Sequence, residues 1–459
     1  MKNIRKELLK EAKRLIRLKS VTTESNKAIA LHVGKLLKEA GFHVRYQAEK
    51  IKGVSFYNVV GQKGKGKHPL IFMTHLDTVP PGPYERWTKT GGDPWNPVIQ
   101  GDRIYGLGSA DTKLDILPKI FASREVPEKL MKRPIVLVGT FGEERGLLGA
   151  RFFCSRLREK GGIALVSEPS ELRWVHEHRG YLVLEVSIPT APYAGRPLEK
   201  MYGVEVKGKA VHSSIPKEGR NAIRIAFDFL DDLSRRNPDL KLLFSAGGSS
   251  PNQVPASASF IFATTEKKIS SRPFIKVSPF KSIGQSGYEI PRKALSDLFD
   301  SVDEGIRKWP RKMTSNVGLI RVEKGWVKFC VDFRVHPKDT NQKVLLLFQK
   351  RIKKVLERHR LYGRFRVERD GPSLSLPPKS SIIHLARSVS RRLGVPFRLI
   401  RKPSCTEAGF LREKGIPAVV FGAGKSGKNI HAPNEYNELS QLEKAFSIYR
   451  SLIEAYCCR

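Results

Sequence analysis

The chain has 459 residues, more than a single hydrophobic core usually holds, so we expect two domains. It contains no run of about 18 apolar residues, which argues against a membrane-spanning helix. Lysine and arginine outnumber aspartate and glutamate by 83 to 45, a formal net charge of +38. These basic residues are spread along the chain without an RNA-binding or zinc-finger motif. We therefore interpret the charge as a general feature of the composition and expect no membrane partner; a nucleic-acid-associated protein is the less favoured alternative.

The N-terminal segment, residues 1–20, is rich in charge and lacks the apolar centre of a signal peptide. Its apolar residues recur at helical spacing, which predicts a helix. The five cysteines are odd in number and follow no metal-binding spacing. We therefore expect reduced thiols and a cytoplasmic protein.

The next segments alternate between helices and apolar strands. The spacing predicts a helix over 26–40, a strand from Val44, strands near 58–61, 69–74 and 134–141, a helix over 147–160 and a strand over 163–167. This alternation is typical of an α/β fold with a mainly parallel sheet. Such sheets bind ligands at the carboxyl ends of their strands.

Polar residues gather at those predicted strand ends. The set is His75 and Asp77, Glu143 and Glu144, Glu168, Asp111 in a glycine-rich segment, and His431 after the apolar run 416–424. Imidazole and carboxylate ligands suit zinc or another borderline divalent metal. Asp77 lies two positions after His75 on the same face, where it could accept the second ring N–H of the histidine. Asp111 could bridge two metals.

Each of these signals has a simpler explanation when taken alone. A single histidine at a strand end is more often structural than a ligand, and a Glu-Glu pair is usually a solvated turn. Together, however, so many candidate ligands after strands of one α/β pattern favour a metal site.

The sequence resembles the two-zinc amidohydrolases and peptidases that include acetylornithine deacetylase, succinyl-diaminopimelate desuccinylase, aminoacylase and carboxypeptidase G. The resemblance rests on ordered blocks along nearly the whole chain: THLDTVP, YGLGSADTKLD, GTFGEERGLLGA, VSEPS, GKAVHSSIPKEGRNAI, VDFRVHP, TEAGFLREKGIPAVVFGAG and HAPNEY. It implies a zinc-peptidase-like catalytic domain with a mainly parallel central sheet, formed by residues 1–178 and 376–459. Residues 179–375 would be an inserted α+β, ferredoxin-like domain with a small sheet and two helices, serving as lid and dimer interface.

The same resemblance implies roles for the polar residues. His75, Asp111 and Glu168 would hold one divalent metal, and Asp111, Glu144 and His431 the other. We expect zinc, with cobalt or manganese as alternatives. Asp77 would orient His75, and the Asp111-Thr112 peptide bond would be cis. Glu143 would act as general base on a metal-bridging water.

Three residues of the inserted domain also match functional positions of the family. His212 would stabilise the oxyanion, commonly from the partner subunit of a homodimer. Arg334 would bind a substrate carboxylate, and Asn252 would contact the substrate. The alternatives are that His212 is a capped loop residue and Arg334 an ordinary strand arginine.

The expected activity is hydrolysis of the amide bond of N-acyl amino acids. A metallo-exopeptidase acting on short peptides is the alternative, and a catalytically inactive binding scaffold is a further one. The sequence departs from the family at Thr406-Glu407, where an aspartate is usual, and this should alter the substrate pocket. Residues 189–202 and 264–295 are extra length in the inserted domain.

Overall fold

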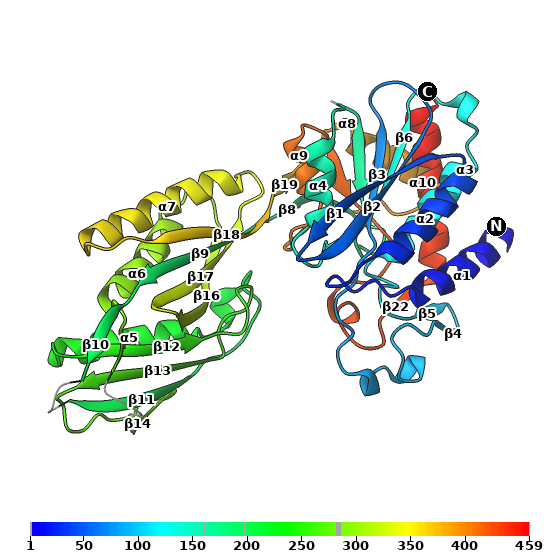
Figure 1. The fold of residues 1–459 in the computed structure, drawn as a ribbon. Coiled ribbons are helices and arrows are strands. Elements are labelled where there is room, and N and C mark those ends of the chain that lie inside the picture. Colours follow the sequence, from blue (N-terminus) through cyan, green and yellow to red (C-terminus); the bar gives the residue numbers. More distant parts are fainter. Residues whose placement is uncertain (1, 160, 196–198, 281–285, 459) are drawn as a thin grey trace. The chain divides into compact units, whose positions relative to one another are not determined.

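The computed structural model describes residues 2–159, 161–195, 199–280 and 286–458. This part of the chain divides into two compact units (Figure 1). The first unit comprises Met1–His178 and Leu374–Arg459, and the second is Arg179–Ser373. The second unit is therefore an insertion into the first.

The first unit is built on a mixed sheet with a parallel centre. Its described strands follow the order β1 (His43–Ile51), β2 (Val54–Lys63), β6 (Ile135–Thr140), β3 (Leu70–His75), β7 (Ile163–Val166), β21 (Ala418–Val420), β8 (Trp174–His178) and β19 (Leu374–Ser375), and β20 (Leu399–Lys402) pairs with β8. The strands β6, β3, β7 and β21 run parallel to one another. The predicted α/β fold with a mainly parallel central sheet is confirmed.

The parallel strands are apolar because helices cover both faces of the sheet. Along β3, Leu70 and Phe72 pack into one core, whereas Ile71 and Met73 pack into another. The first core includes residues of α1 (Lys2–Arg17), α2 (Lys27–Glu39), α3 (Ile116–Arg124), α8 (Ser381–Arg392) and α10 (Leu439–Cys457). The second includes residues of α4 (Leu148–Arg156) and α9 (Ala408–Glu413) (Figure 1). The sheet therefore holds the carboxyl ends of β3, β6 and β7 in a rigid row.

A small antiparallel sheet joins the C-terminal part of the first unit to an earlier loop. Its described strands follow the order β22 (Tyr436–Glu438), β5 (Arg103–Tyr105) and β4 (Val98–Gln100). Tyr436 pairs with Tyr105 in this sheet. The pairing brings the residues around His431 to the loop that carries Asp111.

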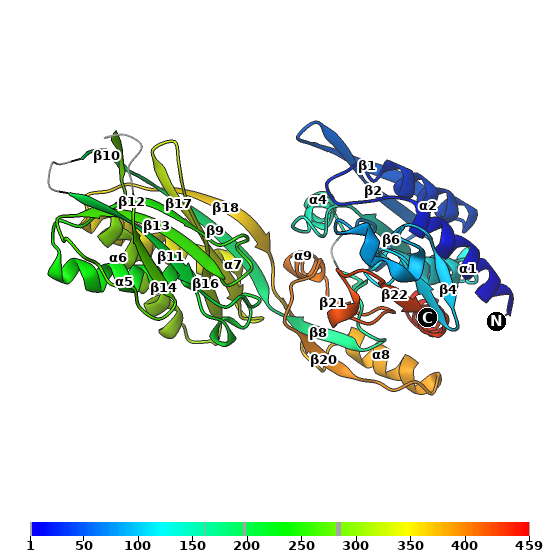
Figure 2. The same cartoon turned by 90° about the horizontal axis from the view of Figure 1, so that it is seen from below.

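The second unit is an antiparallel sheet with helices packed against it (Figure 2). The described strands follow the order β14 (Ile275–Pro279), β11 (Lys200–Lys207), β13 (Ser257–Thr264), β12 (Lys241–Gly247), β16 (Thr314–Glu323), β17 (Trp326–Val335), β9 (Gly180–Pro189) and β18 (Arg364–Gly371). One hydrophobic core joins the sheet to α5 (Ala222–Arg236), α6 (Arg292–Arg307) and α7 (Asn341–Arg358). A separate ribbon pairs β10 (Ala191–Ala194) with β15 (Ser286–Glu289).

The second unit differs from the small domain with two helices that the resemblance implied. Within the described residues, α6 is an additional helix that begins inside the segment interpreted as extra length. The same segment supplies β14, which extends the sheet at its edge. Residues 196–198 and 281–285 of the two extra segments lie outside the described part of the chain.

Short 3-10 helices complete the described elements: η1 (Tyr84–Arg86), η2 (Thr88–Thr90), η3 (Lys113–Asp115), η4 (Glu128–Leu130), η5 (Pro216–Glu218) and η6 (Gly427–Asn429). None of the described helices combines the length and the apolar character needed to cross a bilayer.

Candidate metal centre

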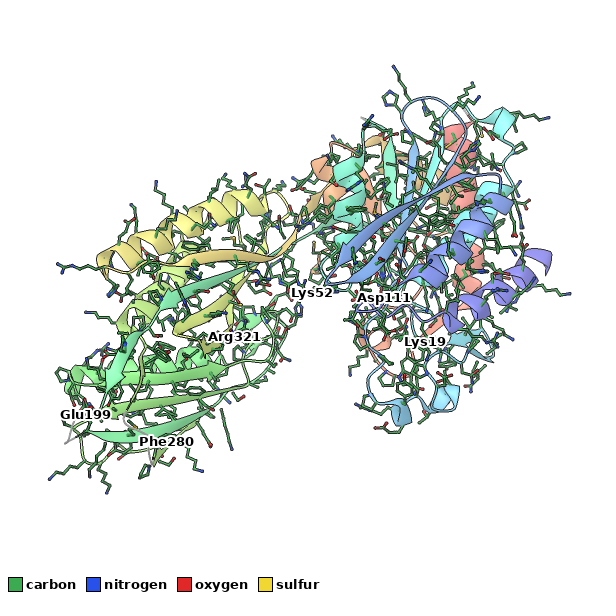
Figure 3. The ribbon with its side chains drawn as sticks, viewed as in Figure 1. Lys19, Lys52, Asp111, Glu199, Phe280 and Arg321 are labelled. Carbon is green, nitrogen blue, oxygen red and sulfur yellow. The ribbon has the colours of Figure 1, made fainter. Side chains whose placement is uncertain are left out.

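The candidate ligands of the first unit come from strand ends and adjoining loops. His75 is the last residue of β3, the pair Glu143 and Glu144 follows β6, and Glu168 follows β7. Asp111 lies on the loop between β5 and η3, and Figure 3 labels it among the side chains of this unit. The parallel order of β6, β3 and β7 places the first four of these residues along one edge of the sheet.

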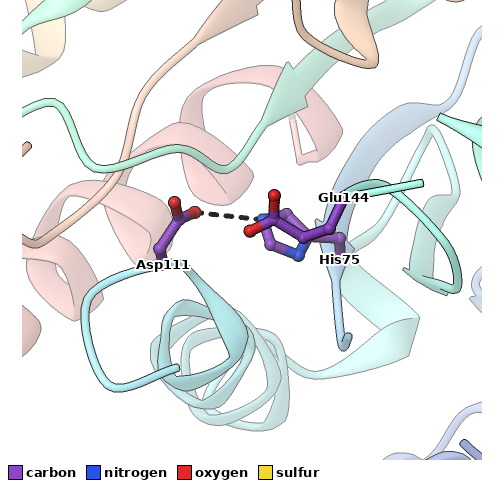
Figure 4. A group of neighbouring side chains, drawn as sticks. All are labelled: His75, Asp111 and Glu144. Carbon is purple, nitrogen blue, oxygen red and sulfur yellow. Dashed lines mark hydrogen bonds and ion pairs between the residues drawn. The ribbon is translucent and has the colours of Figure 1, made fainter. Parts of the chain in front are cut away.

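Asp111 divides its two carboxylate oxygens between two imidazoles. Its Oδ1 lies 3.1 Å from Nε2 of His75, and its Oδ2 lies 3.2 Å from Nε2 of His431. Oε1 of Glu144 lies 2.9 Å from the same His431 nitrogen. One ligand atom each of His75, Asp111 and Glu144 lies within 4.8 Å of the others (Figure 4). The two oxygens of Asp111 thus face two different histidines.

The orientation of His75 leaves its Nε2 available as a ligand. Its Nδ1 lies 3.1 Å from the backbone carbonyl oxygen of Asp77. A carbonyl oxygen can only accept a hydrogen bond, so Nδ1 carries the proton. In the neutral imidazole the lone pair is then on Nε2, the nitrogen that faces Asp111.

The carboxylate of Asp77 contacts a neighbouring loop as well as His75. Its Oδ1 is 3.7 Å from Nδ1 of the histidine. The backbone N–H groups of Glu143 and Glu144 donate to the two oxygens of Asp77, at 3.1 Å and 3.2 Å. Asp77 therefore ties the end of β3 to the loop that follows β6. The Asp111-Thr112 bond is cis, as expected.

Without a cation, the site holds protons on its imidazoles. Burial would lower the pKa of His75, but hydrogen bonds with Asp111 and Asp77 raise it well above its ordinary value. Hydrogen bonds with Asp111 and Glu144 raise the pKa of His431 to about 11. Burial acts to raise the pKa of Asp111, yet its bonds with both histidines lower it. Burial, with the charge of Glu144, raises the pKa of Glu143 well above its usual range.

This donor set fits a divalent metal. Two imidazole nitrogens face carboxylate oxygens at hydrogen-bond distance, a contact that requires either a proton or a cation between them. Nitrogen and carboxylate ligands together suit zinc and similar ions. A metal would replace the protons on both histidines and neutralise part of the carboxylate charge.

Glu168 has a contact that the sequence did not predict. Its Oε2 lies 2.6 Å from Nζ of Lys402, the last residue of β20. Burial would lower the pKa of Lys402, but Glu168 beside it raises the pKa above its ordinary value. A charged ammonium is thus held against one of the predicted metal ligands.

The loop of Asp111 is held by the buried carboxylate of Glu435. Oε1 of Glu435 accepts the backbone N–H groups of Ala110 and Asp111 at 2.8 Å and 2.9 Å, and Oε2 accepts that of Gly108 at 3.1 Å. Asn437 adds a bond from Nδ2 to the backbone oxygen of Ser109, at 2.8 Å. The segment that begins with His431 therefore also fixes the backbone of Asp111.

Glu407, at the departure from the family pattern, is fully buried. The hydroxyl of Thr140 donates to its Oε1 at 2.7 Å. Its Oε2 has no hydrogen-bond partner among the described residues. Burial raises the pKa of Glu407 to about 7, so its carboxyl gains and loses its proton near neutral pH.

In the second unit, the two predicted substrate-binding residues, Arg334 and Asn252, are both hydrogen-bonded to Ser213. Arg334 donates from Nε and Nη2 to the carboxylate of Asp332, both at 2.9 Å, and Nη2 also donates to Ser213 Oγ at 3.0 Å. The backbone N–H of Ser213 donates to the carbonyl of Asn252 at 3.0 Å. His212, next to Ser213, is exposed.

The contacts of His212 select its tautomer. The backbone N–H of Ser214 points at Nδ1 from 3.2 Å, and the Ser214 hydroxyl lies 2.7 Å from the same nitrogen. Nδ1 is therefore the acceptor and Nε2 carries the proton. Burial and the charge of Arg334 lower the pKa of His212, which favours the neutral ring. The Nε2–H group of His212 is suited to donate to an anionic oxygen.

The sequence analysis did not identify Lys402 and Glu435 as site residues, although the sequence position of each pointed to the site. Lys402 ends a strand in the segment LIRK, so the rule that selected His75 and Glu168 applies to it as well. Glu435 belongs to the same HAPNEY block as His431. What the sequence could not supply is the contact partner of either side chain.

Solved structures of peptidases share this fold. An aminoacylhistidine dipeptidase from Vibrio alginolyticus is 19% identical, with a TM-score of 0.67 over 98% of this chain and 96% of that chain. A metallo-carboxypeptidase from Sulfolobus solfataricus is 16% identical (TM-score 0.60, 98% and 99%), and human carnosine dipeptidase 1 is 13% identical (TM-score 0.56, 98% and 96%). The family model of peptidase family M20/M25/M40 matches residues 71–455. Because this match covers most of the sequence, the chain belongs to that family of metal-dependent hydrolases, which act on amide and peptide bonds.

Proposed function

We propose that the protein is a two-metal exopeptidase that hydrolyses short peptides. The observation that carries the hydrolytic part is the division of the Asp111 oxygens between His75 and His431. The choice of peptides over N-acyl amino acids is supported by the similar structures, which are dipeptidases and a carboxypeptidase by name. An N-acyl amino acid deacylase, the expectation from the sequence, has less support.

In this proposal His75, Asp111 and Glu168 hold one ion, and Asp111, Glu144 and His431 hold the other. Zinc is our first choice of metal. When bound, the ions would polarise the scissile carbonyl and lower the pKa of the attacking water.

Glu143 is assigned the proton transfer. One of its carboxylate oxygens takes the proton of the attacking water and then delivers it to the leaving nitrogen. Burial keeps its proton affinity high, as this cycle requires. His212 donates a hydrogen bond from Nε2 to the carbonyl oxygen as that oxygen becomes negative.

Arg334 is assigned a positioning role beside its predicted substrate contact. Its side chain is only 4% exposed, and its Nε and Nη2 are already engaged by Asp332. The same arginine bonds Ser213, next to His212. Holding the His212 segment is thus supported more directly than binding a substrate carboxylate.

The test is turnover of a matched substrate panel by zinc- or cobalt-loaded protein. Dipeptides and tripeptides should exceed the corresponding N-acetyl and N-succinyl amino acids in kcat/KM by at least about ten-fold. Glu143→Gln is the control for contaminating peptidases. It should keep its metal and lose at least ~100-fold in kcat, because an amide cannot accept the proton. Faster turnover of the acyl amino acids would favour the deacylase instead.

A further inference from the structure

The ion pair between Lys402 and Glu168 places a fixed positive charge among the candidate metal ligands. The two side chains are 16% and 8% exposed, and the Nζ to Oε2 distance is 2.6 Å. Asp111 and Glu143 also attract this ammonium. Water therefore screens the charge of Lys402 only weakly from anything bound at Glu168.

An ammonium and a divalent cation compete when they share one carboxylate. The metal must either displace Lys402 from Glu168 or share the carboxylate with it. In both cases the cation meets the repulsion of a nearby positive charge in a medium of low dielectric. The affinity of that metal position must therefore fall.

The other metal position is built differently. There Glu144 contacts His431, at 2.9 Å. A histidine that binds metal is neutral, so it leaves no fixed positive charge beside this carboxylate. The ammonium of Lys402 therefore distinguishes the position held by Glu168 from the position held by Glu144.

We propose that Lys402 competes with the metal for Glu168, so that the position held by Glu168 binds its ion more weakly than the position held by Glu144 and His431. This inference rests on the two-metal site of the proposed function. The weaker affinity would make occupancy of the Glu168 position depend on the concentration of free metal.

Calorimetric titration of Zn²⁺ into metal-free protein tests the proposal. The wild type should bind two ions in steps that differ at least about ten-fold in affinity. Lys402→Met removes the charge at similar length and should tighten the weaker step about ten-fold. Lys402→Arg keeps the charge and should behave like the wild type. Lys10→Met, at an exposed lysine of α1, changes the net charge equally and should alter neither step.

Two further results test whether Glu168 is a metal ligand and whether Lys402 competes with the metal. Glu168→Gln should abolish the weaker step and spare the stronger one, and the reverse result would overturn the assignment. An unchanged or weakened second step in Lys402→Met would overturn the competition, because Lys402 would then merely orient Glu168. Absence of zinc binding in the wild type would overturn the proposed function as well. The readout does not depend on which peptide is hydrolysed.

Discussion

Asp111 links the two histidines of the candidate metal centre, because each of its carboxylate oxygens faces one imidazole. In the metal-free protein these contacts keep protons on the imidazoles, as the raised pKa values of His75 and His431 express. A metal ligand must be a neutral imidazole. Metal binding and proton release are therefore coupled at these residues.

Metal affinity should consequently rise with pH. The pKa of His431 in the metal-free site is about 11, so near pH 7 its ring is protonated and must lose the proton on binding. The apparent association constant should increase about ten-fold per pH unit for each proton released. Zinc titrations in buffers of different ionisation enthalpy will count these protons.

The matched control for this coupling is His32, which pairs with Glu11 at 2.8 Å. His32→Gln should leave the proton count unchanged, whereas His431→Gln should reduce it and weaken binding. A pH-independent affinity between about pH 6 and 8 would contradict the coupling.

The candidate metal ligands that directly follow an apolar strand could be predicted from the sequence. His75, Glu143, Glu144 and Glu168 follow apolar strands, and the sequence shows where such strands stop. The partner of each side chain depends instead on its rotamer and on loop paths, which no spacing rule encodes. The Arg334–Asp332 pair and the Lys402–Glu168 pair appear only in three dimensions.

At the scale of elements, β22 and the loop before η3 are held together by strand pairing and hydrogen bonds. The strand pairing Tyr436–Tyr105 brings Glu435 to the loop, and its carboxylate accepts backbone N–H groups of Gly108, Ala110 and Asp111. The backbone of Asp111 and the segment of His431 are thereby fixed to each other. Supporting contacts of this kind commonly control metal affinity.

Glu435→Gln should therefore weaken metal binding while the protein stays folded. Glutamine keeps the size but replaces one acceptor oxygen by an NH₂ group, which cannot accept the Gly108 or Ala110 N–H. The loss should be about 10- to 100-fold in metal affinity, measured by titration together with thermal unfolding.

Glu438→Gln provides the comparison, because Glu438 lies only three residues after Glu435, at the end of β22, and its carboxylate accepts from the side chain of Gln441 instead. Wild-type affinity in Glu435→Gln would show that the loop holds its shape without the carboxylate.

Most elements were predictable from apolar periodicity, since buried parallel strands are continuous apolar runs. The helix α6 was not predicted from the sequence. Leu295, Leu298, Phe299 and Val302 recur at helical spacing and are buried, so the signal was present in the sequence. The segment interpreted as extra length, 264–295, contains only the first turn of α6, and the sequence analysis assigned no element to residues 296–307.

At the scale of the whole molecule, the assigned base and the assigned oxyanion donor belong to different units. Glu143 lies in the first unit and His212 in the second. The resemblance implies that this histidine reaches the active site of a partner subunit. The two residues can therefore be separated by mixing variants.

Chains carrying His212→Ala and chains carrying Glu143→Gln should each be nearly inactive. Co-refolded at equal amounts, random dimers should recover roughly a quarter of the wild-type rate, because half are mixed and each mixed dimer has one intact site. Peptide hydrolysis after confirmed subunit exchange is the measurement. No recovery would mean that His212 serves its own chain.

Because the second unit is an insertion, the ribosome synthesises it before the C-terminal part of the first unit. The two residues of the first unit that flank the second unit are paired with each other, His178 on β8 and Leu374 on β19. A ribosome adds residues at about 5–20 per second, so the first 178 residues wait for tens of seconds or less before β19 and β21 emerge. During that interval the nascent sheet exposes the edge of β7, and neither His431 nor Glu435 exists. A newly made chain can therefore complete the proposed two-metal site only after its second unit has already been synthesised.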